Sequence, residues 1–323
     1  MPYYIVINTI PYQSQQHFSM TFALFWKEGF EMHTISPGDV MVGLMHSDQN
    51  PWREIVYEGQ FKTWVPVAIS EGFKVIYCFG KKPSKVVSRI DSFNENMRWN
   101  KGTQVSDFRN VANRILAFPF KSYIPTAKKS KISEAPHGVD GLEVNLLDLY
   151  ATGRWKQLAL IYYFLNETQC RYLVISTSAA YLKTKKMLSE LAHLPGPYVY
   201  SGPLYGNSQD KFVSGAQIVI DRAFAHDVIQ FRRWIPTHTL NDLGLGALAR
   251  RLSKEPSELP TVNVGSLSEL HETSLEVLEN NYHFRLKSVD ELNGKRNDVD
   301  IFLELHRRIR ENDENSTKKH GAF

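Results

Sequence analysis

The feature of this sequence that most constrains its fold is the alternation of short apolar, β-rich segments with segments of helical periodicity. The clearest apolar segments are YIVINT, DVMVGLMH, FKVIYCFG and YLVIS, at residues 4–9, 39–46, 73–80 and 172–176. Helical patterns lie between them, for example at residues 17–28 and 52–70. This alternation is typical of α/β proteins, so we predict a mixed, mostly parallel sheet flanked by helices.

We expect residues 1–311 to form one domain. The same alternation of patterns predicts the strands and helices in the rest of the chain. Residues 81–136 are rich in lysine, serine and asparagine, and we interpret them as an insertion with a helix near 107–117 and a mobile loop at 121–136. Alternatively, residues 81–136 form a solvent-exposed insertion without a functional role. The polar residues 312–323 predict a disordered tail. The remaining predicted strands are 141–147, 198–202, 212–220, 261–264 and 282–286, and the remaining helices are 155–165, 184–193, 223–232, 241–252 and 299–310.

Composition narrows the class of protein. The net charge of +4 permits an anionic ligand but does not indicate nucleic-acid binding. No apolar run approaches the roughly 20 residues that span a bilayer, and the N-terminus lacks the features of a signal peptide. Cys78 and Cys170 are expected to be buried thiols. We therefore expect a soluble protein of a bacterial or viral host cytoplasm, or else a trimmed luminal domain, with peripheral membrane contact permitted and the oligomeric state open.

The residues that follow the predicted strands are the first candidates for a site, because open α/β sheets bind ligands beyond the carboxyl ends of their strands. After YLVI the chain reads Ser176, Thr177 and Ser178, with no carboxylate. Mg²⁺ or Mn²⁺ would require carboxylate oxygens there, whereas hydroxyls and backbone amides suit direct contact with a phosphate. A plain strand-to-helix turn capped by Ser178 is the structural alternative.

Several enzyme classes lack their sequence signature in this chain. No G-x-G-x-x-G follows the first predicted strand, which argues against a dinucleotide-binding reductase. A G-x-x-x-x-G-K loop and a G-x-S-x-G elbow are also absent from the sequence. These absences disfavour P-loop enzymes and serine hydrolases.

Five motifs occur in order between residues 145 and 246, about a third of the chain. They are Asp148, Tyr150 and Lys156 in the pattern D-x-Y-x-N-L-T-x-K; Thr177, Ser178 and Ala179 where an acidic triplet would follow a strand; Tyr200 and Gly202 in Y-x-G; Phe212, Ser214 and Gly215 in Y/F-x-S-G; and Asp242 and Gly246 in E-D-V-x-x-G.

In this order and spacing, the motifs resemble the inverting β-galactosyl, N-acetylglucosaminyl and Fringe-type glycosyltransferases of family 31. Arg53 and Trp64 resemble the R-x-x-I-R-x-T-W helix of the same family. The resemblance implies a GT-A-like domain with a Rossmann-like nucleotide-binding half and an acceptor half. It also implies transfer of a hexose or N-acetylhexosamine from a UDP-sugar to a glycan hydroxyl.

The main departure from the family pattern is the loss of the acidic residues that bind a divalent cation. The family's acidic triplet holds a divalent cation beside the leaving diphosphate, and here no carboxylate remains. We therefore expect no metal cofactor, with Mn²⁺ as the alternative. Other groups would then have to stabilise the diphosphate. The candidates for contact with the donor are Thr9, Arg53, Lys156, Ser176, Thr177, Ser178, His283 and Arg285.

The resemblance assigns the general base to Asp242, with Asn241 in place of the family's glutamate. Alternatively, Asp242 is only a first-turn acid at a helix N-terminus. The predicted cleft is lined by Tyr181, Tyr205, Ser214, Gly215, Trp234 and Asn241. Each aromatic side chain could instead belong to the core.

Three hypotheses remain open at this level. The first is an inverting, metal-independent transferase that uses a UDP-sugar. The second is a non-catalytic nucleotide- or glycan-binding relative that lost its metal site. The third is a metal-independent transferase with another donor, such as a cytidine-linked sugar.

Overall fold

The computed structural model of this chain describes residues 34–84, 123–149, 152–194, 196, 198–207, 210–236, 241–288, 296 and 298–320, without the side chains of 315–320. The chain divides into two compact units, Met1–Thr34 and Ile35–Phe323. All elements named below belong to the second unit. The strand predicted at 4–9, with Thr9, and the helices predicted at 17–28 and 107–117 lie outside the described residues. The single domain over 1–311 stays a prediction.

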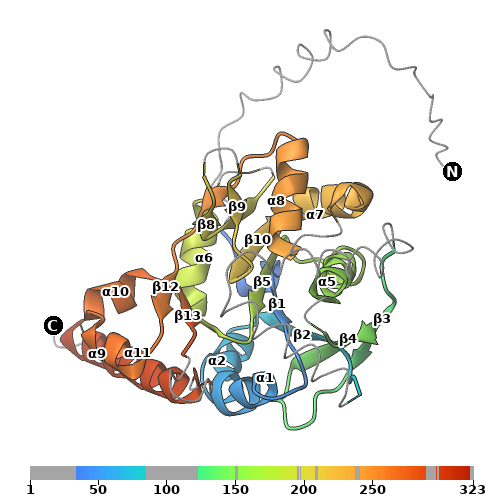
Figure 1. The fold of residues 1–323 in the computed structure, drawn as a ribbon. Helices are drawn as coiled ribbons and strands as arrows, with labels where there is room; N and C mark the ends of the chain where they lie inside the picture. Colours follow the sequence, from blue (N-terminus) through green and yellow to red (C-terminus); the bar gives the residue numbers. More distant parts are fainter. Residues whose placement is uncertain are drawn as a thin grey trace, which may run out of the picture. The chain divides into compact units, whose positions relative to one another are not determined.

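A mixed, mostly parallel sheet forms the centre of the second unit (Figure 1). In the described part of the chain it has eight strands, in the order β11-β7-β10-β5-β1-β2-β4-β3. Only β10 and β3 run antiparallel to their neighbours. The predicted fold class is therefore confirmed. The bounds are β1 Val40–Met45, β2 Lys74–Lys81, β3 Ala127–Ser130, β4 Val139–Leu147, β5 Tyr172–Thr177, β7 Tyr200–Gly202, β10 Gln217–Asp221 and β11 Ser257–Glu258.

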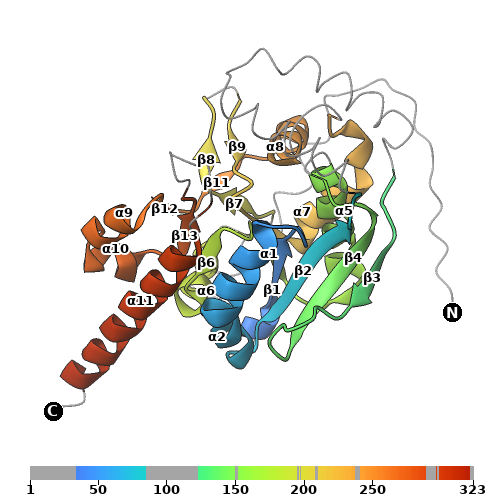
Figure 2. The same cartoon turned by 60° about the horizontal axis from the view of Figure 1, so that its bottom comes forward.

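Helices cover both faces of this sheet, because its central strands are apolar on both sides. Val40, Val42 and Leu44 of β1 belong to one core with α2 (Trp64–Ser70) and α6 (Thr184–Ala192). Met41 of β1 belongs to a second core with α5 (Gly153–Glu167), α7 (Arg222–Gln230) and α8 (Asn241–Arg251). Figure 2 shows α1 (Trp52–Glu54) and α2 on the opposite side of β1 and β2 from α5.

The chain reverses its direction across the sheet at β1. From β1 it proceeds outward to β2 and β4, and then α5 carries it back to β5 on the other side of β1. Gly43 lets α5 approach β1 closely, because a Cβ there would lie 2.6 Å from a methyl group of Leu160. In α/β sheets ligands bind at such a switch point, beyond the carboxyl ends of the two strands. The ends of β1 and β5 are therefore where the site is expected.

A smaller sheet lies next to the end of β5. Its described strands are β12 (Val262–Val264), β13 (His283–Leu286) and β6 (Ala180–Leu182), in that order. The helices α9 (Leu267–Glu272), α10 (Leu275–Asn280) and α11 (Asp298–His320) pack beside it (Figure 1). A two-stranded hairpin, β8 (Leu204–Tyr205) with β9 (Phe212–Val213), contacts α8. None of the described helices is long and apolar enough to cross a membrane.

Three segments differ from the sequence prediction. Residues 312–320 were expected to be disordered, but they continue α11, and Arg307–Glu311 and Arg310–Glu314 ion pairs at i,i+4 spacing support that helix. The loop at 121–136 contains β3, whose lysines occupy an edge strand paired with β4. The strand predicted at 212–220 is interrupted at 214–216 and divides into β9 and β10.

Candidate functional site

The turn at the carboxyl end of β5 is held by side chains from the segment between β1 and β2. Gln60 donates its amide to the carbonyls of Thr177 and Ala180, at 3.2 and 2.9 Å. The indole of Trp64 also donates to the Ala180 carbonyl, at 3.0 Å, and the hydroxyl of Tyr77 fixes Gln60 by donating to its amide oxygen, at 2.8 Å. These contacts fix the backbone on both sides of the Ser178–Ala179 turn.

A continuous set of contacts connects this strand end with Asp242. Ser176 donates its hydroxyl to the carbonyl of Ala216, at 2.9 Å. The Ala216 amide donates to the Ser214 hydroxyl, at 3.3 Å, and the Gly215 amide donates to Asp242 Oδ2, at 3.0 Å. The segment between β9 and β10 therefore joins the end of β5, through the Ala216 carbonyl, to the first turn of α8, through the Gly215 amide.

The carboxylate of Asp242 is oriented but remains accessible. Asp242 is partly exposed, and its second oxygen, Oδ1, accepts from the amide of Leu243, at 2.9 Å. Each carboxylate oxygen has two lone pairs, so both can still accept a proton or a further hydrogen bond. Asn241, the preceding residue, is also partly exposed. The geometry is compatible with a general base, and the position in the first turn of α8 also matches the structural alternative.

Lys156 occupies a different environment from the one expected. Its ammonium group lies 2.5 Å from Asp148 Oδ1 and donates to the His46 carbonyl, at 3.2 Å. Both side chains of the ion pair are almost completely buried, at 7% and 2% exposure. The other oxygen of Asp148 accepts from the amide of Asp48, at 3.1 Å. The charge of Lys156 is therefore used to anchor the loop after β1, and its contact with a donor stays a prediction.

His283, another residue predicted to contact the donor, also lies in a buried environment. It is fully buried in β13, and its Nδ1 lies 2.6 Å from the hydroxyl of Thr261. Burial, together with the positive charge of Arg285, lowers the pKa of His283 to about 3. The ring is therefore neutral near pH 7 and cannot compensate a diphosphate charge.

The two remaining cationic candidates differ in their partners. Arg53 is exposed on α1, where its guanidinium lies 3.7 Å from Asp48 Oδ1 and 5.0 Å from the ring centre of Tyr57. Arg285 is partly buried in β13, directly opposite Ala180 of β6. The structure therefore brings Arg285 to the turn after β5, a position that only the pairing of two remote segments reveals.

The aromatic residues predicted for the cleft fall into different regions. Tyr181 is 3% exposed, and its hydroxyl lies 2.8 Å from Nδ1 of His306 in α11, so it belongs to the core rather than to a sugar platform. Trp234 stacks on Phe231 and lies under Arg251, at the C-terminal end of α8. That end is about 13 Å from Asp242 along the helix, so Trp234 is not brought next to Asp242 by α8.

Tyr205 retains the exposure that a sugar-stacking residue needs. It is 45% exposed on the hairpin strand β8, opposite Phe212 of β9. Gly246 of α8 lies under this hairpin, because a Cβ there would be 2.5 Å from Cβ of Phe212. Tyr205 is thus placed beside the helix that carries Asp242.

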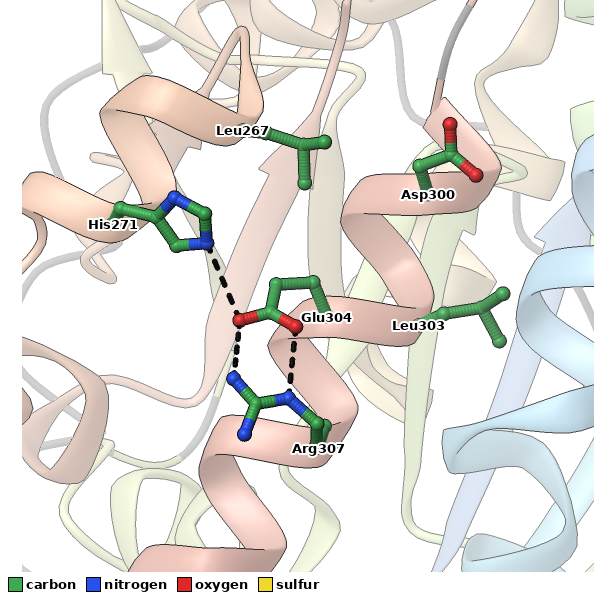
Figure 3. Close-up of a pocket in the computed structure, with 6 residues that line it drawn as sticks. All are labelled: Leu267, His271, Asp300, Leu303, Glu304 and Arg307. Atoms are coloured by element: carbon green, nitrogen blue, oxygen red, sulfur yellow. Dashed lines mark hydrogen bonds and ion pairs between the residues drawn. The ribbon is translucent and has the colours of Figure 1, made fainter.

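One pocket lies outside this region, between α9 and α11 (Figure 3). Its lining residues are Leu267, His271, Asp300, Leu303, Glu304 and Arg307. Figure 3 shows Glu304 between His271 and Arg307: His271 Nε2 lies 3.4 Å from one carboxylate oxygen, and Arg307 donates to both, at 2.6 and 2.9 Å. The hydrogen bonds from Arg307 hold the pKa of Glu304 below its usual value. The ion pair of Glu304 with Arg307 lies within α11, and the contact of Glu304 with His271 connects α11 to α9.

In the described part of the chain, no group of three or more histidine, cysteine, aspartate or glutamate residues is arranged to hold a metal ion. At the end of β5, Thr177 is partly exposed, whereas Ser178 and Ala179 are buried, and none of the three side chains is a carboxylate. A nucleotide held there would have to be contacted through amides, hydroxyls and basic side chains.

No protein-family model and no curated protein matches the chain. Among solved structures, it is similar to the glycosyltransferase GlyE of Streptococcus pneumoniae TIGR4, with 8% sequence identity and a TM-score of 0.38. That likeness covers 86% of this chain and 64% of the other, so the chain spans less than two thirds of the length of that protein.

Proposed function

We propose that this chain is an inverting glycosyltransferase that needs no divalent cation and transfers a sugar from a UDP-sugar to a hydroxyl of a glycan acceptor. The observation that carries the proposal is the set of contacts from Ser176 through Ala216 and Gly215 to Asp242. It connects a hydroxyl-rich strand end, at the switch point of the sheet, to a partly exposed carboxylate. A phosphate site and a general base can therefore share one edge of the sheet.

In the proposed reaction, Asp242 accepts the proton of the acceptor hydroxyl while that oxygen attacks the anomeric carbon of the donor sugar. The bond from the anomeric carbon to the phosphate oxygen breaks on the opposite side, and the nucleoside diphosphate leaves with the bonding electrons. The hydroxyls and amides at Thr177–Ala179 would stabilise the charge that develops on this leaving group. Inversion at the anomeric carbon follows from a single displacement.

The resemblance to family 31 supports the reaction class, and the positions of its motifs are compatible with it. Asp148 and Lys156 form a buried pair that anchors the loop after β1, and Trp64 braces the turn after β5. Two parts of the pattern thus position the ends of β1 and β5. We propose metal-independent transfer because the side chains of Thr177, Ser178 and Ala179 include no carboxylate.

The test is Asp242→Asn, assayed for transfer and hydrolysis on a panel of nucleotide sugars, with chelator and with added Mn²⁺. Loss of a general base typically costs about 10²- to 10⁴-fold in turnover. We expect that loss with nucleotide affinity unchanged. Asp140→Asn is the matched control, because the Asp140 side chain is 44% exposed near the start of β4 and forms an ion pair with Lys129 of β3, at 3.5 Å.

Each result distinguishes between the hypotheses. Equal turnover of Asp242→Asn and the parent would refute the base assignment. A parent that binds nucleotide sugars but transfers none would identify a non-catalytic relative. Strict dependence of turnover on Mn²⁺ would refute metal independence. Activity with a cytidine-linked sugar alone would show that the donor is not a UDP-sugar.

A further inference from the structure

The small sheet brings a basic residue to the turn that would hold the donor diphosphate. Strand β6 begins at Ala180, directly after the Ser178–Ala179 turn, and pairs antiparallel with β13. In that pairing Arg285 lies opposite Ala180, and the amide of Leu286 donates to the Ala179 carbonyl, at 2.8 Å. Hydrogen-bonded strands lie about 4.8 Å apart, so the Arg285 backbone is one strand away from this turn.

The side chain of Arg285 lies on the face of the small sheet that is not covered by α11. Directly opposite residues of an antiparallel pair share a face, so Arg285 is on the same side as the methyl group of Ala180. Phe284 and Leu286 lie on the other side, within the core that also contains Phe302 of α11. Ala180 is fully buried, whereas Arg285 beside it is partly exposed.

The charge of Arg285 is not neutralised by the described protein. The strands β6, β12 and β13 contain no carboxylate, and Arg285 is their only formally charged residue. No described residue forms a hydrogen bond or ion pair with its guanidinium, although the side chain is partly buried. The other basic candidates differ, since Lys156 pairs with Asp148 and Arg53 lies near Asp48. A partly desolvated guanidinium without an anion is suited to an anionic ligand.

We propose that Arg285 replaces a divalent cation by forming charge-assisted hydrogen bonds to the diphosphate of the donor at the Thr177–Ala179 turn. This inference rests on the proposed function. The guanidinium carries a permanent charge and a planar fork of donors that matches phosphate oxygens. The turn itself offers only hydroxyls and amides to the diphosphate. Arg285 would therefore supply the positive charge that compensates the negative charge of the diphosphate.

The experiment measures the binding of UDP, UMP and uridine to the full chain by calorimetry in excess chelator. Arg285→Gln should weaken UDP binding about 10- to 100-fold, the range expected when hydrogen bonds to a charged group are lost. Uridine affinity should not change, because the contact is to phosphate. Arg285→Lys should recover part of the loss, since it restores the charge without the fork. Arg310→Gln is the matched control, because Arg310 is 67% exposed on α11, and it should bind like the parent.

The outcomes separate this inference from the proposed function. If the parent binds UDP in chelator and Arg285→Gln binds it equally well, the role of Arg285 is refuted while the transferase proposal stands. If UDP binding requires Mn²⁺, a metal performs the task and the inference also fails. If the parent binds no nucleoside diphosphate from a panel of UDP, CDP and GDP, with or without Mn²⁺, the proposed function itself fails. Thermal unfolding of every variant shows whether a loss of binding reflects loss of the fold.

Discussion

Replacing Lys156 by methionine should strongly destabilise the fold, because the substitution removes one half of a buried ion pair. The Asp148 carboxylate would keep the Asp48 amide but lose the ammonium group 2.5 Å from its other oxygen. The His46 carbonyl would lose its contact with the same ammonium group. Breaking a buried pair by removing one partner costs about 3–5 kcal/mol. In a domain of this size each kcal/mol lowers Tm by roughly 2–4 °C, so the expected decrease is roughly 6–20 °C.

The measurement is a double-mutant cycle in urea with Asp148→Asn, Lys156→Met and the combined variant. The combined variant should be less destabilised than the sum of the two single variants, because neither charge is then left buried alone. Nucleotide affinity should stay at the parental value in any variant that remains folded. A Lys156→Met protein as stable as the parent that has lost affinity for UDP would refute the reasoning. It would show that this lysine contacts the donor, as the sequence alone suggested.

Further predictions concern pH, the approach to the carboxylate and the core. Burial lowers the pKa of His46 to about 4 and that of His283 to about 3, so the unfolded state binds more protons below pH 6.5. Urea unfolding should therefore show stability falling as pH decreases from 6.5, and a flat profile down to about pH 5 would contradict the burial of both rings. Gly215→Ala should lower turnover more than nucleotide affinity, because its Cβ would lie 3.2 Å from Asp242 Oδ2; equal effects on both would refute this. Tyr181→Phe should cost about 1 kcal/mol of stability through its lost hydrogen bond and leave turnover unchanged, whereas a selective loss of transfer would place the residue in the cleft.

The strands of the central sheet could be predicted from the sequence because their signal is local. Apolar residues at 39–46, 73–80 and 172–176 are buried on both faces of the sheet, and that requirement is visible within each segment. The short strands β6 and β11 carry no such signal, since two or three residues cannot show a period. Their structure comes from pairing with segments that are remote in the sequence.

The sequence could not predict which charged side chains are available to bind a ligand. Lys156 and Arg285 are both basic residues near predicted strand ends, yet one is buried against Asp148 and the other has no partner among the described residues. His283 follows the same logic, because its neutral state depends on burial between β6 and β12. Tertiary contacts decide which charge remains for a ligand. A motif reports residue types at a spacing and does not contain this information.

The most direct test of the central proposal is a crystal structure of the full chain with UDP, grown and soaked in the presence of chelator. We predict that the diphosphate lies beyond the carboxyl end of β5, contacting Thr177–Ala179, without a metal ion and on the same side of the sheet edge as Asp242. Binding of UDP elsewhere, or a turn after β5 that is closed by protein and separated from Asp242, would contradict the proposed site.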